Sequence, residues 1–283
     1  MGVEEIIKHM DETFDPENDP KVKLLYLETI NHPEMLLKHA KSLIKKGCRI
    51  AAVKAGTSEA GSRAASSHTG ALASSDMAAD ALFKKAGIIR CYGREDLISV
   101  ASVFMKPELK GKNIAIITHA GGPAVMLTDS LSNGGLKVPE IKGKEAEKLK
   151  EELFPGSSVA NPIDFLATGT AEQLGTIIDY CNNDFDEIDA MVVIFGTPGL
   201  TEIYDVYKIL DDKIKAGGKP IFPVLPSTLT AKNEVEYFVN LDNTFFPDEV
   251  TLGNALSRVY GKNNNIYEDD SEHVKIDKQG IRK

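Results

Sequence analysis

The sequence predicts an α/β protein built as two successive units, each with a parallel β-sheet covered by helices. Short apolar runs that indicate buried strands alternate with longer amphipathic patterns, and this alternation is typical of parallel sheets. The alternation breaks at Pro107–Lys112 and then starts again. The chain has 283 residues, which suits about two domains of ordinary size.

The first unit is expected to contain three strands. His32–Lys46 shows a helical pattern, because its apolar residues recur on one face, its lysines lie elsewhere and Gly47 ends it. The elements expected in order are a helix at Val3–Met10, a strand at Val22–Leu27, a helix at His32–Lys46, a strand at Arg49–Lys54, a flexible loop at Ala55–Gly61, a helix from Ala71 to Gly87, a strand at Ile88–Tyr92 and a helix at Arg94–Met105.

The second unit repeats this style. Ala190–Phe195 is apolar throughout, as expected of a strand buried on both faces. The elements expected in order are a strand at Asn113–Ile117, helices at Ala124–Asn133 and Lys142–Leu153 with a short strand at Leu136–Pro139 between them, a strand end near Ala160–Phe165, a helix at Ala171–Cys181, the strand Ala190–Phe195, a helix to about Ala216, a strand at Pro220–Leu225, a helix at Ala231–Asn240, a last strand at Phe245–Phe246 and a helix at Val250–Tyr260. From Gly261 the chain is polar, which indicates a linker or tail.

Composition excludes several classes of protein. The chain is 42% hydrophobic and 27% charged, as soluble globular proteins are, and its formal net charge of −9 argues against a nucleic-acid surface. No apolar run approaches the roughly 20 residues that span a bilayer, and the N-terminus lacks a signal-peptide pattern, so we expect a cytoplasmic protein. Cys48, Cys91 and Cys181 are too far apart to predict a disulfide framework or a metal site.

His68 is the first candidate for catalysis. It lies in Ser66–Gly70, after the strand Arg49–Lys54, and we expect it on the loop that leads into the helix from Ala71. Helix N-termini favour anions, and an imidazole can attack a phosphoryl group. The alternative is a surface or capping histidine, and Arg63 nearby is either an anion contact or a solvated residue.

Glu28 is the second candidate, because it follows the strand Val22–Leu27 at the sheet edge where the His68 segment also emerges. A carboxylate bonded to one imidazole nitrogen would leave the other free to attack. The alternative is a solvated glutamate that opens a turn.

Two further strand-to-helix loops, Thr118–Pro123 and Gly196–Gly199, are candidates for ligand binding, since ligands gather beyond the carboxyl ends of parallel strands. Many such glycines simply serve tight turns. His119 competes with His68 as the reactive histidine, and Asp164 is either a polar site residue or a turn and N-cap residue. Neither a complete dinucleotide fingerprint nor a phosphate-binding P-loop is present.

Three motifs together resemble one enzyme family. Lys54–Gly56, Gly61 and Ser67–Ala73 are similar to the phosphohistidine segment of ADP-forming acyl-CoA synthetases, the acetate–CoA ligase type related to succinyl-CoA synthetase. Ile116–Pro123 resembles the start of their next domain, and Asn161–Phe165 resembles their Asn-Pro-x-Asp motif. The resemblance runs from about residue 3 to 260. It implies two flavodoxin-like, succinyl-CoA synthetase-type domains, at 1–108 (bearing the histidine) and 109–260, with 261–283 as a polar linker or tail.

The resemblance also implies roles for residues. His68 would be the phosphorylated nucleophile and Glu28 the residue that orients it, with the helix after His68 and the helix after Gly196–Gly199 flanking the phosphohistidine. The implied phosphate- and substrate-binding positions are Ser67, Thr69, Gly70, Thr118, Gly121, Gly122, Gly196, Thr197, Pro198 and Gly199. The implied reaction interconverts acyl-CoA, ADP and phosphate with acid, CoA and ATP. A non-catalytic module of the same fold that binds acyl-CoA or an anion is the alternative.

Parts of the family pattern are missing from the sequence. The CoA-binding domain and the first two βα units of the histidine domain would precede residue 1, and Val274–Lys283 resembles the lead-in to an ATP-grasp domain. We therefore expect a middle part of a longer enzyme, inactive alone, whose partners are CoA-binding and ATP-grasp domains or subunits and a small carboxylic acid. CoA and ATP or ADP with Mg²⁺ would bind mainly to those parts, and no metal site is expected in this chain. A homo-oligomer is also possible.

Overall fold

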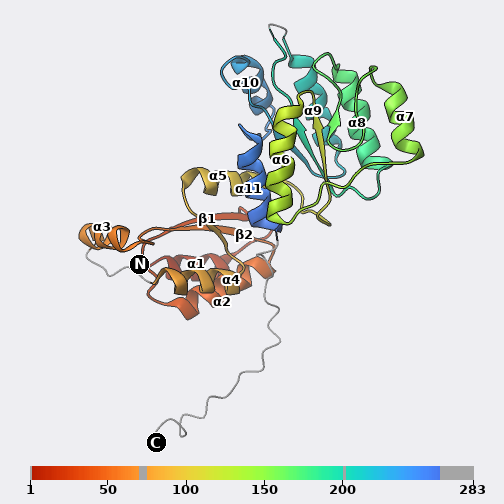
Figure 1. Ribbon diagram of the computed structural model, residues 1–283. Helices are drawn as coiled ribbons and strands as arrows, with labels where there is room; N and C mark the ends of the chain where they lie inside the picture. Colours follow the sequence, from red (N-terminus) through yellow and green to blue (C-terminus); the bar gives the residue numbers. More distant parts are fainter. Residues whose placement is uncertain (1, 70–74, 200–201, 262–283) are drawn as a thin grey trace, which may run out of the picture.

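The first α/β unit holds a sheet of three parallel strands. The structure is a computed structural model that describes residues 2–69, 75–199 and 202–261 (Figure 1). The elements of this unit are α1 (Val3–Thr13), β1 (Val22–Leu27), α2 (Pro33–Lys45), β2 (Arg49–Lys54), α3 (Glu59–Thr69), α4 (Asp76–Ala86), β3 (Ile89–Cys91) and α5 (Arg94–Phe104). The strand order is β1-β2-β3, with α1, α2 and α4 on one face and α5 on the other (Figure 1). The three strands predicted for this unit are thereby confirmed.

The second unit holds four parallel strands in the order β5-β4-β6-β7. Its elements are β4 (Ile114–Thr118), α6 (Gly121–Gly134), α7 (Lys144–Glu152), β5 (Ile163–Asp164), α8 (Ala171–Asn183), β6 (Ala190–Ile194), α9 (Tyr204–Ala216), β7 (Ile221–Val224), α10 (Lys232–Asn240) and α11 (Glu249–Tyr260). Every residue of β4, β6 and β7 is buried, because α8 and α9 cover one face of the sheet and α6 and α11 cover the other.

Two predicted strands of the second unit are reduced to single bridges. Lys137 pairs only with Asn113, and Phe246 pairs only with Val224. Each segment runs beside the sheet for too short a distance to form a ladder. The predictions of strands at Leu136–Pro139 and Phe245–Phe246 were therefore right about position and wrong about extent.

The two units share one hydrophobic cluster, in which α11 packs against both α5 and α6. Close approach of α6 and α11 depends on Gly134 and Gly253, since a Cβ on either would overlap Ser257 or Ser130. An ion pair at 2.7 Å between Arg258 Nε and Asp96 Oδ1 links α11 to α5.

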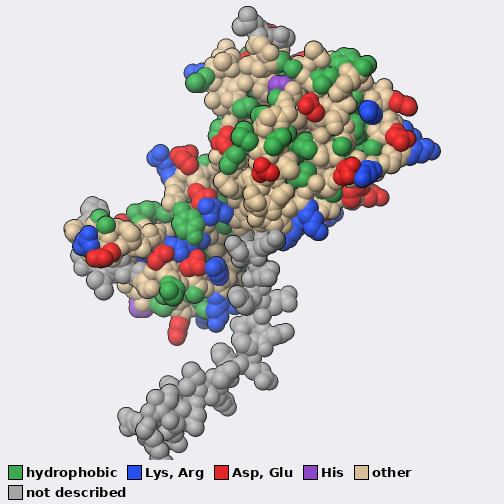
Figure 2. All heavy atoms as spheres, in the orientation of Figure 1, with side chains coloured by type: hydrophobic (Ala, Val, Ile, Leu, Met, Phe, Trp, Pro, Cys, Tyr) green, Lys and Arg blue, Asp and Glu red, His purple; other side chains and the backbone are tan. Residues whose placement is uncertain are grey.

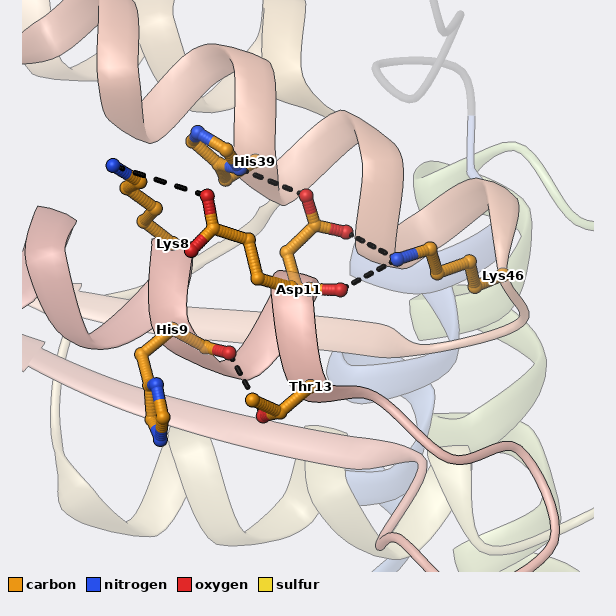
Figure 3. Close-up of polar contacts among 7 residues, drawn as sticks. Lys8, His9, Asp11, Thr13, His39 and Lys46 are labelled. Carbon is orange, nitrogen blue, oxygen red and sulfur yellow. Dashed lines mark hydrogen bonds and ion pairs between the residues drawn. The ribbon is translucent and has the colours of Figure 1, made fainter.

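A buried polar network joins α1 to α2 (Figure 3). Asp11 Oδ2 lies 2.8 Å from His39 Nδ1, and Lys46 Nζ donates to Asp11 Oδ1 at 2.8 Å and to the Asp11 carbonyl at 2.5 Å. Burial raises the pKa of Asp11, but hydrogen bonds from Lys46, Ser42 and His39 outweigh it and bring that pKa to about 2. The network therefore holds a carboxylate between the two helices.

The surface shows no concentration of one charge on the face in view, where acidic and basic side chains are interspersed (Figure 2). Within the described ranges, no helix combines the length and the apolar character that crossing a membrane requires.

Candidate functional site

The carboxyl edge of the first sheet brings Glu28 next to the segment that leads to His68. Leu27 at the end of β1 is paired with Lys54 at the end of β2, and the Ala55 N–H donates to the Leu27 carbonyl at 2.8 Å. Glu28 and Ala55 therefore leave the sheet side by side, and Glu28 is half-buried there. This is the adjacency that the strand pattern predicted.

The structure corrects the local prediction for His68. We expected a loop, but Glu59–Thr69 forms the helix α3 and the backbone of His68 lies in its last turn. Of the helix predicted from Ala71, residues 71–74 lie outside the described part of the chain, and Asp76–Ala86 forms the helix α4. The side chains of His68 and Thr69, and all of Gly70, lie outside the described part of the chain.

Local interactions explain why α3 forms. Ser58 Oγ accepts a hydrogen bond from the Gly61 N–H at 3.1 Å, as an N-cap side chain does. Glu59 and Arg63 form an i,i+4 ion pair at 2.8 Å. This capping signal was present in the sequence, but the glycines and serines around it favoured the prediction of a loop. His68 lies at the end of α3 opposite to the helix N-terminus. The partial positive charge of that N-terminus is therefore not available to His68.

The helix α3 lies at the periphery of the molecule. None of its residues from 59 to 67 is buried, and α3 projects from the end of the first unit, clear of the second unit in the view of Figure 1. The structure therefore does not bring the Gly196–Gly199 loop beside the His68 segment. The flanking of His68 by a helix end of the second unit stays a prediction.

Lys54 is a further candidate site residue that the sequence patterns did not single out. Its side chain is buried at the same edge, and its ammonium donates to the Ala55 carbonyl at 2.6 Å and to the Gly56 carbonyl at 3.5 Å. Burial lowers the pKa of Lys54, while the charges of Asp76 and Glu28 raise it in part. The sequence feature that could have identified Lys54 is its position as a lysine at the end of an otherwise apolar strand. It places a buried positive charge close to Glu28.

The second sheet has its own carboxyl edge, where Thr118 and Asp164 are paired neighbours. Thr118 Oγ1 donates to the Ala120 carbonyl at 2.8 Å and accepts from the Ala120 N–H at 3.0 Å, so it stabilises its own turn. Asp164 Oδ1 accepts from the Leu166 N–H at 2.9 Å, which is the turn role weighed from the sequence.

His119 cannot act as a phosphoryl acceptor in this arrangement. Its Nε2 accepts a hydrogen bond from the Gly196 N–H at 3.0 Å, so the neutral ring carries its proton on Nδ1. Nδ1 is buried and has no hydrogen-bond partner among the described residues, and the ring packs against Phe195 with centroids 4.4 Å apart. Burial lowers the pKa of the imidazole, and the charge of Asp164 offsets part of this. Neither nitrogen presents a free lone pair.

The Gly196–Gly199 loop uses its own N–H groups internally. The Gly196 N–H goes to His119, the Thr197 N–H donates to Ser227 Oγ at 2.9 Å, and the Gly199 N–H reaches Thr197 Oγ1 at 3.3 Å. Pro198 has no N–H. In this state the loop has no backbone donor to spare for an anion, and its role in substrate binding stays a prediction.

The N-terminus of α6 is more open than that loop. The helix starts at Gly121 with no side-chain cap, and a Cβ added to Gly122 would meet no atom of the described residues within 4 Å. Asp164 Oδ2 lies 3.5 Å from the position of a Cβ on Gly121. Gly121 and Gly122 thus remain predicted ligand contacts.

A cavity of about 970 Å³ lies away from both edges, between α4 and the pair α6 and α11. Its lining includes Arg90, which is ion-paired with Asp76 and Asp80, and Arg258, which is paired with Asp96. Apart from Asp76 near Lys54, it shares nothing with the candidate residues above. In the described ranges no group of three or more His, Cys, Asp and Glu side chains is arranged to hold a metal ion.

Comparison with known proteins agrees with the motif resemblance. Residues 2–104 match the family described as succinyl-CoA ligase like flavodoxin domain. The chain is 39% identical over 163 residues to the acetate–CoA ligase [ADP-forming] II subunit alpha of Pyrococcus furiosus, covering 58% of this chain and 35% of that subunit. It is 40% identical over 162 residues to the acetate–CoA ligase [ADP-forming] of Methanocaldococcus jannaschii, covering 57% of this chain and 23% of that enzyme.

A longer alignment, 28% identical over 254 residues, joins 88% of the chain to 54% of the acetate–CoA ligase [ADP-forming] I subunit alpha of P. furiosus. The chain thus spans about half, or less, of the length of these relatives. Its fold is that of the dinucleotide forming acetyl-coenzyme A synthetase 1 of Ca. Korarchaeum cryptofilum, solved in complex with phosphate and ADP. The TM-score is 0.80 at 24% identity, and the match covers 92% of this chain and 56% of that one.

Proposed function

We propose, from the premise that the chain belongs to the ADP-forming acetate–CoA ligase family, that it is the part of such a ligase that carries a phosphoryl group on His68. The enzyme would interconvert acyl-CoA, ADP and phosphate with acid, CoA and ATP. One observation carries the proposal: Glu28 and the segment that leads to His68 leave adjacent strands side by side, tied by the Ala55 to Leu27 hydrogen bond.

The proposed chemistry is two phosphoryl transfers. A nitrogen of His68 attacks the phosphorus of an acyl phosphate, the P–N bond forms and the carboxylic acid leaves as its carboxylate. A nucleoside diphosphate then takes the phosphoryl group and the P–N bond breaks, which returns the free imidazole. Glu28 would hold the other ring nitrogen and stabilise the charge that develops on the ring.

Lys54 supports this assignment electrostatically. A buried ammonium near Glu28 keeps a positive charge at the edge where two anions, the carboxylate and the phosphoryl group, have to meet. In a low-dielectric surrounding such a charge acts more strongly than it would in water.

The surroundings of the other histidines also favour His68. His119 has both nitrogens occupied or shielded, and His39 is buried against Asp11. His9 is exposed on α1, which precedes β1, and His32 is exposed at the start of α2, where its backbone N–H donates to Glu4 Oε1 at 3.0 Å. His273 lies outside the described residues.

The nucleotide, its Mg²⁺ and CoA are assigned to partner domains or subunits. The described residues provide neither a P-loop nor a cluster of metal-ligating side chains, so they do not fit a Mg²⁺–nucleotide site. CoA, ATP or ADP and Mg²⁺ would therefore act on this chain from outside it.

The test is phosphoryl transfer in a reconstituted enzyme. The chain is incubated with its ATP-grasp partner, Mg²⁺ and γ-labelled ATP, and acid-labile label on the chain is counted. We expect label on the wild type and on the control His32→Ala, and none on His68→Ala. Glu28→Gln should slow labelling roughly 10–100-fold. Equal labelling of wild type and His68→Ala would overturn the proposal, and no label on either would favour the non-catalytic module.

A further inference from the structure

The contact between His119 and Gly196 joins two loops that are distant in the sequence. His119 follows β4, Gly196 follows β6, and the N–H of Gly196 donates to Nε2 of His119 at 3.0 Å across 77 positions of chain. Both residues lie at the carboxyl edge of the second sheet, since Thr118 and Ile194 at the strand ends are paired. The Gly196–Gly199 loop is one that the family resemblance implicates in substrate binding.

The hydrogen bond requires a neutral ring. Only an unprotonated Nε2 has a lone pair to accept the Gly196 N–H. A protonated ring would set its own N–H against that of Gly196, and it would still have Nδ1–H buried without an acceptor. The bond and the charge on the ring are therefore mutually exclusive.

We propose that His119 is a titratable clamp that positions the Gly196–Gly199 loop, holding it while the ring is neutral and releasing it when the ring is protonated. The loop's other anchor is Ser227 Oγ, which accepts from the Thr197 N–H and does not titrate. Release at Gly196 would free a backbone donor next to a new positive charge, which is an arrangement that favours an anion.

The surroundings determine the direction of the pH dependence. Burial against Phe195 favours the neutral ring and lowers the pKa of His119, whereas the carboxylate of Asp164 on β5 favours the charged ring. Among the described residues, Asp164 is the charged group that acts on His119. The clamp is therefore closed above the lowered pKa and opens as the pH falls through it.

The importance of the clamp for substrate binding rests on the proposed function, but the clamp itself can be measured on this chain without any ligand. The clamp is observed at the backbone amide of Gly196, and that signal does not depend on whether His68 accepts a phosphoryl group. The two proposals can thus fail separately.

The Gly196 amide can be observed alone by NMR. Phe195–Gly196 is the single Phe-Gly pair in the sequence, so ¹³C-carbonyl phenylalanine combined with ¹⁵N-glycine labels one amide among the 23 glycines. Its chemical shift and its hydrogen-exchange protection, normalised to the intrinsic rate at each pH, are followed together with the His119 ring resonances. We expect the amide and the ring to titrate with one midpoint, below that of an exposed histidine, and protection to fall about fivefold or more on the acid side.

Two variants separate the clamp from general unfolding. His119→Gln keeps an acceptor near the Nε2 position but cannot titrate, so Gly196 should stay protected at both ends of the pH range. His119→Leu keeps apolar bulk against Phe195 and removes the acceptor, so Gly196 should be unprotected throughout, while the Thr197 amide stays protected by Ser227. A Gly196 amide that does not respond to the titration of His119, or that responds equally in His119→Gln, would overturn the proposal.

Discussion

Asn161 completes the backbone hydrogen bonding of β4 at a place where no strand is available. Asn161 Oδ1 accepts the Ile116 N–H at 2.9 Å, and Asn161 Nδ2 donates to the Ile114 carbonyl at 3.0 Å and to the Pro139 carbonyl at 2.9 Å. The pairing of β4 with β5 starts just beyond, at Ile117. The side chain therefore acts as a short extension of β5, and it sets the register that delivers Asp164 to the carboxyl edge.

Replacing Asn161 with alanine should be strongly destabilising. Ile116 is completely buried, and leaving its N–H without a partner costs about 1–3 kcal/mol, with a further loss of about 1 kcal/mol for the two carbonyls. Asn161 also has φ of 66°, where a Cβ without a compensating polar group costs roughly 1 kcal/mol. The free energy of unfolding should fall by about 4 kcal/mol in Asn161→Ala and by about 3 kcal/mol in Asn161→Gly, which avoids the strain.

Urea unfolding is the suitable assay, followed by far-ultraviolet circular dichroism because the chain has no tryptophan. Asn240→Ala, at an exposed position at the end of α10, is the matched control and should change stability by less than about 0.5 kcal/mol. If Asn161→Ala were as stable as the control, or more stable than Asn161→Gly, the account of Asn161 as a strand substitute would be wrong.

Three further predictions, one of them with a matched control variant, test separate parts of the fold. Asp11→Asn should remove a stabilisation of about 2 kcal/mol that is fully present above pH 4. In the wild type this stabilisation is lost as the pH falls toward the folded-state pKa of about 2. The difference between the two proteins in urea unfolding should therefore shrink over that range. Gly134→Ala should cost about 1–3 kcal/mol, because its methyl group would meet Ser257. Gly122→Ala on the same helix should be neutral or stabilising, and equal effects of the two would refute the packing argument. Thr170→Ala should cost about 1 kcal/mol, as the loss of an N-cap does, and should lower the melting temperature without affecting phosphoryl transfer.

Local sequence patterns predicted the order of most elements and the parallel sheets, although they did not predict the helix α3. Strand and helix periodicity is local, so Arg49–Lys54 and Ala190–Ile194 could be recognised as buried strands without knowledge of their partners. The adjacency of Glu28 to the His68 segment followed as well, because neighbouring parallel strands end at one edge of a sheet.

Other features depended on tertiary contacts. Whether the N–H groups of Gly196 and Thr197 are open to a ligand depends on His119 and Ser227, which lie 77 and 30 positions away and reach the loop only when the sheet has formed. The same contact occupies the Nε2 lone pair of His119 in this structure. Burial of Lys54, the bonds of Asn161 to β4 and the peripheral position of α3 likewise require the folded chain. A sequence pattern shows which groups can form hydrogen bonds, but only the assembled structure determines which of them already have partners.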